Sequence, residues 1–338
     1  MFRSRKRAIA IALFMVLPLV LAACSAHGGK KAAEAAAGGG TAVAAGHANT
    51  PHYTVAMITH AAPGDTFWDI IRHGALAASA KDNVTLKYSS DPDPTKQAAL
   101  ITDAINSHVN GIAVTDPNPA ALCPTIKKAV SSGIPVVMFN AGVGNWQQCG
   151  GMEYFGQDEA IAGDAAGTRL AAAGAKYVLC VLQETGQVQL EARCAGVQKG
   201  LGSEGTMTKL YVNGRDNAAV LSGITAKLTQ DKTIDAVLTL GAPYALIAIQ
   251  AVGSSHSNAK IYTFDTNAAL IAKIKSGQVQ WAVDQQPYLQ GYESVDSVWL
   301  YLTNANVLGG GVTVLTGPAF IDAKNVAQVS KYAAAGNR

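Results

Sequence analysis

The chain has 338 residues, of which 49% are hydrophobic and only 14% are charged, and its formal net charge at pH 7 is +3. This composition suits a compact α/β protein, and it excludes a nucleic-acid-binding protein because no basic aromatic stretch or recognition-helix pattern accompanies the small charge. The body from about residue 51 onward is long enough for one large or two medium domains.

The first 23 residues have the pattern of a secretory signal peptide. A basic start precedes an uncharged apolar run, residues 8–21, which is short for a transmembrane helix. The run ends in "LAAC", which resembles a bacterial lipobox and implies cleavage before Cys24 and lipid attachment to its sulfur. An ordinary signal peptide followed by a chance cysteine is the alternative, and the position of Cys24 at the junction favours the lipoprotein.

Residues 24–52 form a predicted flexible linker. They are rich in Ala, Gly and small polar residues, with no strand or amphipathic pattern that would repay the entropy of ordering them. His27, His47 and His52 are candidate metal ligands, but their loose spacing and the lack of a cysteine or carboxylate cluster favour a solvated linker. No metal is therefore expected.

The body alternates short β-branched runs with helical stretches, which predicts βαβ units and parallel sheets. The number of strands is high for one sheet and natural for two. The predicted strands are "TVAMI", "VTLKY", "GIAVT", "IPVVMF", "KYVLCVL", "KLYV", "IDAVLTL", "KIYTF" and "VQWAV". The predicted helices between them include "PTKQAALITDAINSHV", "PTIKKAVSSG", "DEAIAGDAAGTRLAAAG", "NAAVLSGITAKLTQ" and "NAALIAKIKSG".

Two aromatic residues stand at the first strand-to-helix junction, in "GDTFWDIIRHGA". Asp65 is a plausible N-cap, which places Phe67 and Trp68 in the first helical turn, at the edge of a parallel sheet where ligands bind. The core-facing stripe of this helix is complete without Trp68, whereas Phe67 shares that stripe. The stripe consists of Ile70, Ile71, Gly74, Ala75 and Ala78. A binding role is therefore favoured for Trp68.

Four cysteines remain besides Cys24, and an even number in an exported chain suggests two disulfides with three possible pairings. They are Cys123, Cys149, Cys180 and Cys194. Buried free thiols are the alternative. No C-x-x-C is present, so a redox-active site is not expected.

Taken together, several segments resemble the type I periplasmic sugar-binding proteins, of the ribose- and galactose-binding kind, which serve ABC importers. The resemblance runs from about Tyr53 to near the C-terminus. The segments that carry it are "DTFWDIIRHGA", "GIAVTDPNPAAL", "GIPVVMFNAG", "FGQDEAIAGDAAG", "YTFDTNAALIAKIKSG" and "VDQQPYLQGYESV". The last two are typical of the simple-sugar branch.

The resemblance implies a fold of two similar doubly wound parallel-sheet lobes joined by a three-strand hinge. The N-terminal lobe would comprise residues 53–155 plus 286–311, and the C-terminal lobe residues 156–285 plus 312–338. The chain would cross between lobes near 154–157, 285–286 and 310–314. Because the lobes of such proteins move, the disulfides are expected within each lobe, Cys123 with Cys149 and Cys180 with Cys194.

The resemblance also implies a ligand site with no catalytic residue and no cofactor. Its aromatic platform would be Phe67 and Trp68, which suit the apolar C–H face of a sugar. Polar side chains would bond the hydroxyl groups, because carboxylates, amides and a guanidinium satisfy adjacent donors and acceptors. These side chains are Asp65, Asn140, Arg193, Asp265 and Gln285.

Two positions depart from the ribose-type pattern, so ribose itself is not expected. Ala141 follows Asn140 where the family has an arginine, and Gly241 replaces an asparagine of the second lobe. Arg215 and Tyr244 lie near the matched ligand loops and are candidates to compensate.

Other interpretations exist for the individual residues. Asn140 and Asp265 would also serve as helix N-caps, and Arg193 as a surface cation or a partner of Glu184 or Glu191. "GLGSEG" matches G-x-G-x-x-G only formally, since it follows a helix and not a strand. The concurrence of polar residues at several strand ends favours the ligand site.

The predicted protein is an extracytoplasmic lipoprotein, a monomer anchored to the cell membrane through Cys24, that captures a sugar or sugar alcohol for the permease of an ABC importer. A sensory protein that presents its ligand to a membrane receptor would share this fold and site. A transcription regulator would need a DNA-binding headpiece where the signal peptide stands. An exported enzyme would need an oriented acid–base pair, for which His60 and Asp65 are the residues to examine.

Overall fold

The computed structural model describes residues 46–338, so the predicted signal peptide, Cys24, His27 and most of the predicted linker lie outside the described residues. The described part of the chain forms two six-stranded sheets, each covered by helices on both faces. None of its helices is both long enough and apolar enough to cross a membrane.

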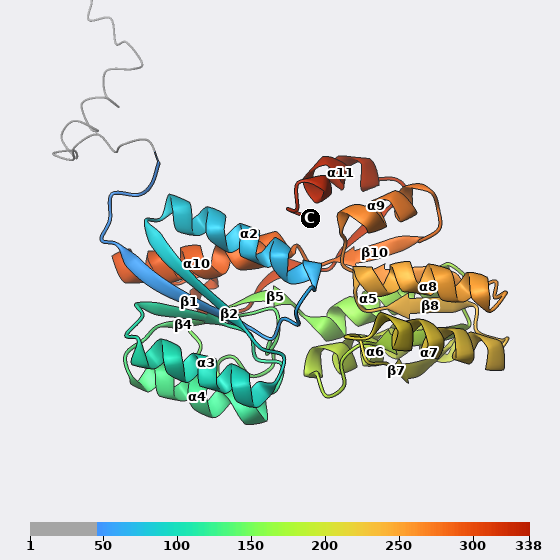
Figure 1. Cartoon of the computed structure of the whole chain (residues 1–338), viewed down its shortest axis with the longest axis horizontal. Coiled ribbons are helices and arrows are strands. Elements are labelled where there is room, and N and C mark those ends of the chain that lie inside the picture. The colour runs from blue at the N-terminus through green and yellow to red at the C-terminus, as the bar shows by residue number, and fades with distance from the viewer. Residues whose placement is uncertain (1–45) are drawn as a thin grey trace, which may run out of the picture. The chain divides into compact units, whose positions relative to one another are not determined.

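The first sheet has the strand order β11-β5-β4-β3-β1-β2, and every neighbouring pair is parallel. Helices α2 and α10 pack on one face and α3 and α4 on the other (Figure 1). The strands are β1 (Tyr53–Thr59), β2 (Val84–Ser90), β3 (Gly111–Val114), β4 (Val136–Phe139), β5 (Glu153–Gln157) and β11 (Val314–Gly317). The helices are α2 (Thr66–Lys81), α3 (Pro94–Asn106), α4 (Pro119–Ser131) and α10 (Pro287–Asn304).

The second sheet has the order β12-β10-β9-β8-β6-β7, in which only β12 runs antiparallel to its neighbour. Helices α5 and α6 cover one face, and α7, α8, α9 and α11 the other. Its strands are β6 (Tyr177–Leu182), β7 (Thr206–Tyr211), β8 (Ala236–Thr239), β9 (Lys260–Phe264), β10 (Trp281–Asp284) and β12 (Ala319–Asp322). Its helices are α5 (Glu159–Ala172), α6 (Val188–Leu201), α7 (Asn217–Gln230), α8 (Ala242–Ser254), α9 (Ala268–Lys275) and α11 (Val326–Ala334).

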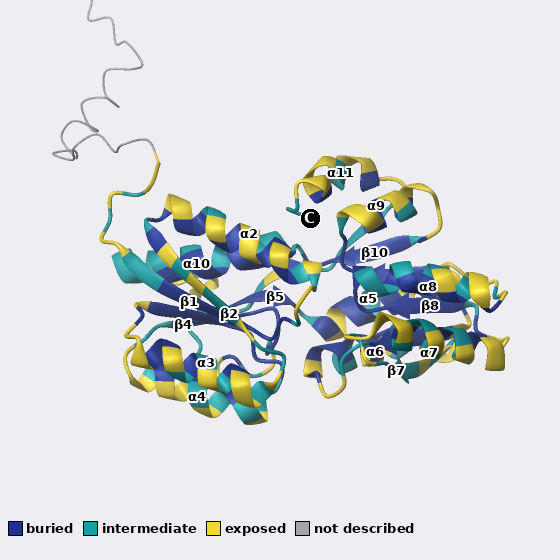
Figure 2. Ribbon diagram, in the orientation of Figure 1, coloured by how far each residue is buried: buried dark blue, intermediate teal, exposed yellow. Residues whose placement is uncertain are grey.

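Burial explains why the strands could be recognised from the sequence. The central strands β3, β4, β8 and β10 are buried at every residue, as parallel strands between two helix layers must be. The edge strands β2 and β7 include exposed residues. Figure 2 shows the same pattern, with buried strands inside and the exposed residues on the outer faces of the helices. The predicted α/β architecture of two doubly wound lobes is confirmed.

The chain passes between the two lobes after β5, after β10 and between β11 and β12. The third passage lies at Gly317–Ala319, not near 310–314 as predicted, because the glycine-rich turn η2 (Leu308–Gly311) connects α10 to β11 within the first lobe. Residues 156–157 complete β5 and belong to the first sheet as well. The predicted lobe boundaries at 155 and 311 were therefore wrong by a few residues.

The end of the predicted linker is also more ordered than expected. Within residues 46–52, the hydroxyl of Thr50 accepts from Nε1 of Trp299 in α10 (3.1 Å), and His52 Nε2 bonds Oγ1 of Thr85 in β2 (2.8 Å). These residues are attached to the first lobe because their polar groups find partners there. A linker that extends to residue 52 is therefore too long.

Candidate functional site

The seven predicted ligand residues all line one cavity where the two lobes meet, which we call the inner cavity. Asp65, Phe67, Trp68 and Asn140 come from the first lobe, Arg193 and Asp265 from the second, and Gln285 from the passage after β10. Their position follows from the topology, because the carboxyl ends of parallel strands share one edge of a sheet. The residues that the family resemblance selected therefore line one cavity, whereas ligand contact by each residue stays a prediction.

The aromatic pair stands at the start of α2. Asp65 is the N-cap, and its side chain accepts from the backbone N–H of Phe67 (3.0 Å). The rings of Phe67 and Trp68 meet edge to face with centroids 5.2 Å apart. Trp68 is only 6% exposed and belongs to the core cluster of the first lobe, whereas Phe67 is only partly buried. The expectation that Trp68 stays off the core stripe was wrong: its large ring contacts the core and lines the cavity at once.

Asn140 and Asp265 occupy equivalent places in the two lobes. Each directly follows a strand, β4 or β9, and each has a left-handed backbone, with φ of +62° and +64°. Asn and Asp tolerate this conformation better than other side chains, and such backbones concentrate at functional sites. Neither is a helix N-cap: the element that follows Asn140 is β5, and α9 is capped by Asn267, whose side chain accepts from Leu270 N–H (2.8 Å). The capping interpretation is therefore wrong.

Gln285 links the two lobes through its amide. Its Nε2 donates to Asp265 Oδ1 (2.8 Å), and its Oε1 accepts from Asn140 Nδ2 (3.2 Å) and from Gln290 Nε2 (3.0 Å). All four side chains are buried. A chain of hydrogen bonds thus runs from the first lobe through the passage after β10 to the second lobe, and it fixes the donors and acceptors at the floor of the inner cavity.

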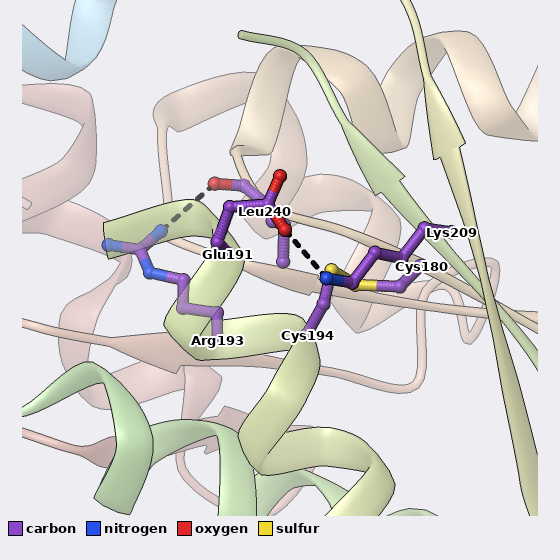
Figure 3. Close-up of a disulfide and its surroundings, with 6 residues drawn as sticks. All are labelled: Cys180, Glu191, Arg193, Cys194, Lys209 and Leu240. Atoms are coloured by element: carbon purple, nitrogen blue, oxygen red, sulfur yellow. Dashed lines mark hydrogen bonds and ion pairs between the residues drawn. A yellow bond between two sulfur atoms is a disulfide. The ribbon is translucent and has the colours of Figure 1, made fainter. Parts of the chain in front are cut away.

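Arg193 is held by Glu159 at the start of α5. Its Nε and Nη2 donate to the two carboxylate oxygens of Glu159 (2.6 and 2.9 Å), and its Nη1 donates to Leu240 O (3.1 Å, drawn in Figure 3). Arg193 is 4% exposed, so it is not a surface cation. The suggested partners Glu184 and Glu191 are wrong, since Glu191 pairs with Lys209 (2.6 Å). Two of the five guanidinium N–H groups remain for a ligand.

A close approach of two helices places this pair. A Cβ at Gly163 in α5 would lie 2.2 Å from the carbonyl oxygen of Arg193, and a Cβ at Gly196 in α6 would lie 2.6 Å from Ala160 O. Only glycine permits the backbones of α5 and α6 to approach this closely. The glycines therefore bring Glu159 within bidentate reach of Arg193.

Both disulfides lie within a lobe, as expected. Cys123 is bonded to Cys149 in the first lobe, and Cys180 to Cys194 in the second. Figure 3 shows that the second disulfide joins β6 to α6 at the residue next to Arg193. It therefore restrains the helix turn that presents the guanidinium to the inner cavity.

Burial dominates the acid–base behaviour of the cavity. It raises the pKa of Asp265 to about 7, and the nearby Arg193 and the Gln285 amide only partly oppose this rise. Burial, with a smaller contribution from Asp65, also raises the pKa of Glu184 to about 7. Near neutral pH these carboxyl groups exchange between acceptor and donor forms, which suits hydroxyl groups that both donate and accept.

The sequence analysis missed the residues that follow β6. Gln183, Glu184 and Gln189 line the inner cavity, and the Oε1 atoms of both glutamines are buried without a hydrogen-bond partner within the described residues. Unsatisfied buried acceptors are costly, so these atoms call for a donor from a ligand or water. The same strand-end rule applied to "QETGQVQ" would have found them. Tyr244 also lines the cavity, whereas Arg215 does not.

His60 does not form an acid–base pair with Asp65. Its Nδ1 bonds Thr115 Oγ1 (2.8 Å), and its Nε2 bonds Nε2 of Gln189 (3.3 Å), which lies on the other lobe. Burial, and then the charge of Arg193, lowers the pKa of His60 to about 3. The ring is therefore neutral at physiological pH. No cluster of three or more His, Cys, Asp or Glu suited to a metal occurs among residues 46–338, and His52 bonds Thr85 instead.

A model of the periplasmic binding protein domain matches residues 55–306, which is most of the chain. The chain belongs to the periplasmic binding protein family. The family resemblance stated from the sequence is thereby confirmed.

Several solved structures share this fold. A carbohydrate transporter from Acidothermus cellulolyticus 11B, solved in complex with myo-inositol, is 62% identical, with a TM-score of 0.84 over 85% of this periplasmic binding protein and 100% of that chain. A solute-binding protein from Burkholderia graminis C4D1M in complex with D-arabinose is 22% identical, with a TM-score of 0.74 over 82% and 98% of the two chains. At this identity, the similarity to the Burkholderia graminis protein shows only that the two chains share a fold.

Among curated proteins, the xylose/arabinose-binding protein XylF of Sulfolobus acidocaldarius is 25% identical over 259 residues, which is 70% of this chain. The match spans 63% of the length of that relative. These relatives are sugar-binding and transport proteins, not enzymes.

Proposed function

We propose that this periplasmic binding protein captures a cyclic polyol, of the size of myo-inositol or a monosaccharide, between its two lobes and delivers it to the permease of an ABC importer. The observation that carries the proposal is the inner cavity, where two aromatic rings face a buried set of donors and acceptors from both lobes.

The chemistry of the inner cavity supports a polyhydroxylated ligand. Phe67 offers a partly exposed ring for C–H groups, while Arg193 offers two free N–H donors and Gln183 and Gln189 offer unpartnered acceptors. A ring of hydroxyl groups donates and accepts around its whole circumference, so it satisfies both kinds of group. Few other small neutral molecules do so.

A cyclitol is the first candidate because the relative that is 62% identical was solved with myo-inositol. Gly241, which departs from the ribose-type pattern, lines the inner cavity beside the ring of Tyr244. A Cβ at Gly241 would lie 3.2 Å from Cδ2 of Tyr244, so Tyr244 occupies the place of the expected side chain. A six-membered carbocycle with a hydroxyl on every carbon would engage the surrounding donors and acceptors.

Isothermal titration of the mature protein against myo-inositol, ribose, arabinose and galactose tests the proposal. We expect myo-inositol to bind most tightly. Asp265→Ala should weaken binding by about 1–3 kcal/mol, because a ligand hydroxyl and the Gln285 amide would lose a buried hydrogen-bond partner. Asp231→Ala is the matched control, since Asp231 is a carboxylate of the same lobe remote from the inner cavity. Absence of binding to every compound in the panel would contradict the proposal.

Lipid anchoring at Cys24 is part of the proposed function. "LAAC" resembles a lipobox, and the segment that follows would tether the lobes to the membrane. Mass spectrometry of the mature protein should find a lipidated N-terminal cysteine, and Cys24→Ala should release the protein from membranes. An unmodified Cys24 inside a longer N-terminus would refute this part.

A sensory role is the second candidate, since a protein that presents its ligand to a receptor has the same site. Uptake of labelled myo-inositol separates the two. Deletion of the gene should abolish high-affinity uptake if the protein serves an importer, and should leave it unchanged if the protein serves only a receptor.

A further inference from the structure

A second compartment adjoins the inner cavity and opens to solvent between the lobes; we call it the outer compartment. The two share Gln183, Glu184 and Tyr244 as a common wall. The outer compartment has a volume of about 430 Å³, compared with about 50 Å³ for the inner cavity. A ligand confined to the inner cavity would therefore leave the outer compartment empty.

The common wall is fixed by a close backbone contact. Gly214 N–H donates to Gln183 O (2.9 Å), and the Tyr244 hydroxyl donates to Gly214 O (3.4 Å). A Cβ at Gly214 would lie 2.6 Å from the Tyr244 hydroxyl oxygen, so only glycine fits here. The wall that separates the two compartments on the second lobe therefore has a defined shape.

The outer compartment has groups prepared for a polar ligand. Gln187 is 9% exposed, and its Oε1 is buried with no partner among the described residues; Gln183 Oε1 on the shared wall is in the same state. Such acceptors need a donor. Tyr211 also lines the outer compartment, and it is 48% exposed, as a stacking residue for the C–H face of a sugar would be.

The charges of the outer compartment favour a neutral ligand. Its charged side chains are Glu184 and Arg215, one of each sign. The guanidinium of Arg215 forms no hydrogen bond or ion pair with another described residue, so its donors are free for hydroxyl groups. A phosphate would meet only one cation and would face the carboxyl group of Glu184.

We propose that the outer compartment is a second sugar-ring subsite, so that the preferred ligand is a cyclic polyol carrying a second ring through a glycosidic bond. One ring would occupy the inner cavity, and the other would bond Gln187 and Arg215 and stack on Tyr211. This inference rests on the proposed function, and it extends the ligand class from one ring to two.

Isothermal titration with single-ring and two-ring compounds tests the inference. The probes are myo-inositol, galactosyl-myo-inositol, melibiose and lactose, with myo-inositol 1-phosphate as the anionic comparison. We expect at least one two-ring compound to bind at least tenfold more tightly than myo-inositol. Tyr211→Ala and Gln187→Ala should each weaken that compound at least fivefold and change the Kd of myo-inositol less than twofold.

Three results would overturn the inference and leave the proposed function intact. In the first, myo-inositol binds but no two-ring compound binds as tightly. In the second, the variants weaken one-ring and two-ring ligands equally, and in the third, myo-inositol 1-phosphate binds most tightly. Failure of every one-ring and two-ring compound to bind would remove the proposed function and the inference together. Tyr301→Ala, which removes an exposed tyrosine of α10 away from both compartments, controls for loss of a surface aromatic ring.

Discussion

Phe67 and Trp68 are adjacent in the chain but serve the molecule differently. Trp68 packs into the core of the first lobe and contacts His60 edge to face (centroids 4.6 Å apart), whereas Phe67 is partly exposed at the inner cavity. Phe67→Ala should therefore weaken ligand binding by about 1–2 kcal/mol and lower the ligand-free Tm less than Trp68→Ala does. Trp68→Ala should lower both, with a loss of stability of about 3–5 kcal/mol.

Thermal melting without ligand and titration with myo-inositol check the two variants side by side. The assignment would be wrong if Phe67→Ala melted as low as Trp68→Ala, or if it bound ligand as tightly as the wild type. Ile161→Ala, at an exposed apolar residue of α5, is the control for removal of a large apolar side chain.

The neutral ring of His60 leads to a prediction about the pH dependence of stability. Since Gln189 donates to Nε2, the proton of His60 lies on Nδ1 and is donated to Thr115. The pKa of His60 is lowered by burial and by Arg193 from 6.5 to about 3. The unfolded chain therefore binds a proton that the folded protein does not bind between these values, and stability falls as the pH decreases below about 6.5.

Comparison of wild type with His60→Gln isolates this effect from the carboxylates of the cavity. Between pH 7.5 and pH 5, the wild type should lose about 2 kcal/mol of unfolding free energy more than the variant, which is about 1.5 pKa units. Urea denaturation of both proteins at both pH values measures this difference in unfolding free energy. Parallel pH dependence in the two proteins would show that folding does not lower the pKa of His60.

At the scale of elements, the contact between α5 and α6 decides where Arg193 lies. Gly163→Ala would place a methyl group against Arg193 O and push α6 away. We expect a loss of stability of about 1–3 kcal/mol from overpacking, together with weaker ligand binding, since Glu159 would no longer reach the guanidinium with both oxygens.

Gly253→Ala is the matched control for the change at Gly163. Gly253 lies in α8, where an added Cβ has no neighbour within 4 Å, so the variant should retain full stability and affinity. Equal effects of the two substitutions on melting and on titration would mean that the helix contact does not position the site.

For the whole molecule, the two lobes are in direct contact at the start of α6, beside the inner cavity. Val188 N–H, at the start of α6, donates to Pro117 O of the first lobe (3.4 Å), and Gln189 bonds His60 across the same gap. These bonds can form only when the lobes are closed. Hydrogen exchange at Val188 should therefore slow at least tenfold when myo-inositol is added, as the closed form becomes dominant.

The amide of Cys180 provides the reference for this measurement. Cys180 lies within β6, which is buried inside the second lobe, so its exchange should not depend on ligand. If Val188 exchanged equally fast with and without ligand, closure on binding would be excluded.

The sequence by itself determined the architecture of this protein and most of its site. Alternating apolar runs and helical stretches are local patterns that predict parallel sheets, and ligands bind at the carboxyl ends of such strands. The family resemblance then assigned Asn140, Asp265 and Gln285 to one ligand site between the two lobes. The pairing of the cysteines followed from the lobes that the family resemblance implied.

Only the tertiary structure decided the features that depend on contacts between distant segments. Glu159 and Arg193 are paired because two helices pack glycine against backbone, and no periodicity along either helix encodes that partner. The passage at Gly317 and the burial of Trp68 likewise depend on which strand β11 joins and on how α2 meets the sheet. The division of the cleft by Gly214 and Tyr244 has the same origin: side-chain distances between loops are set by packing, which a linear pattern does not contain.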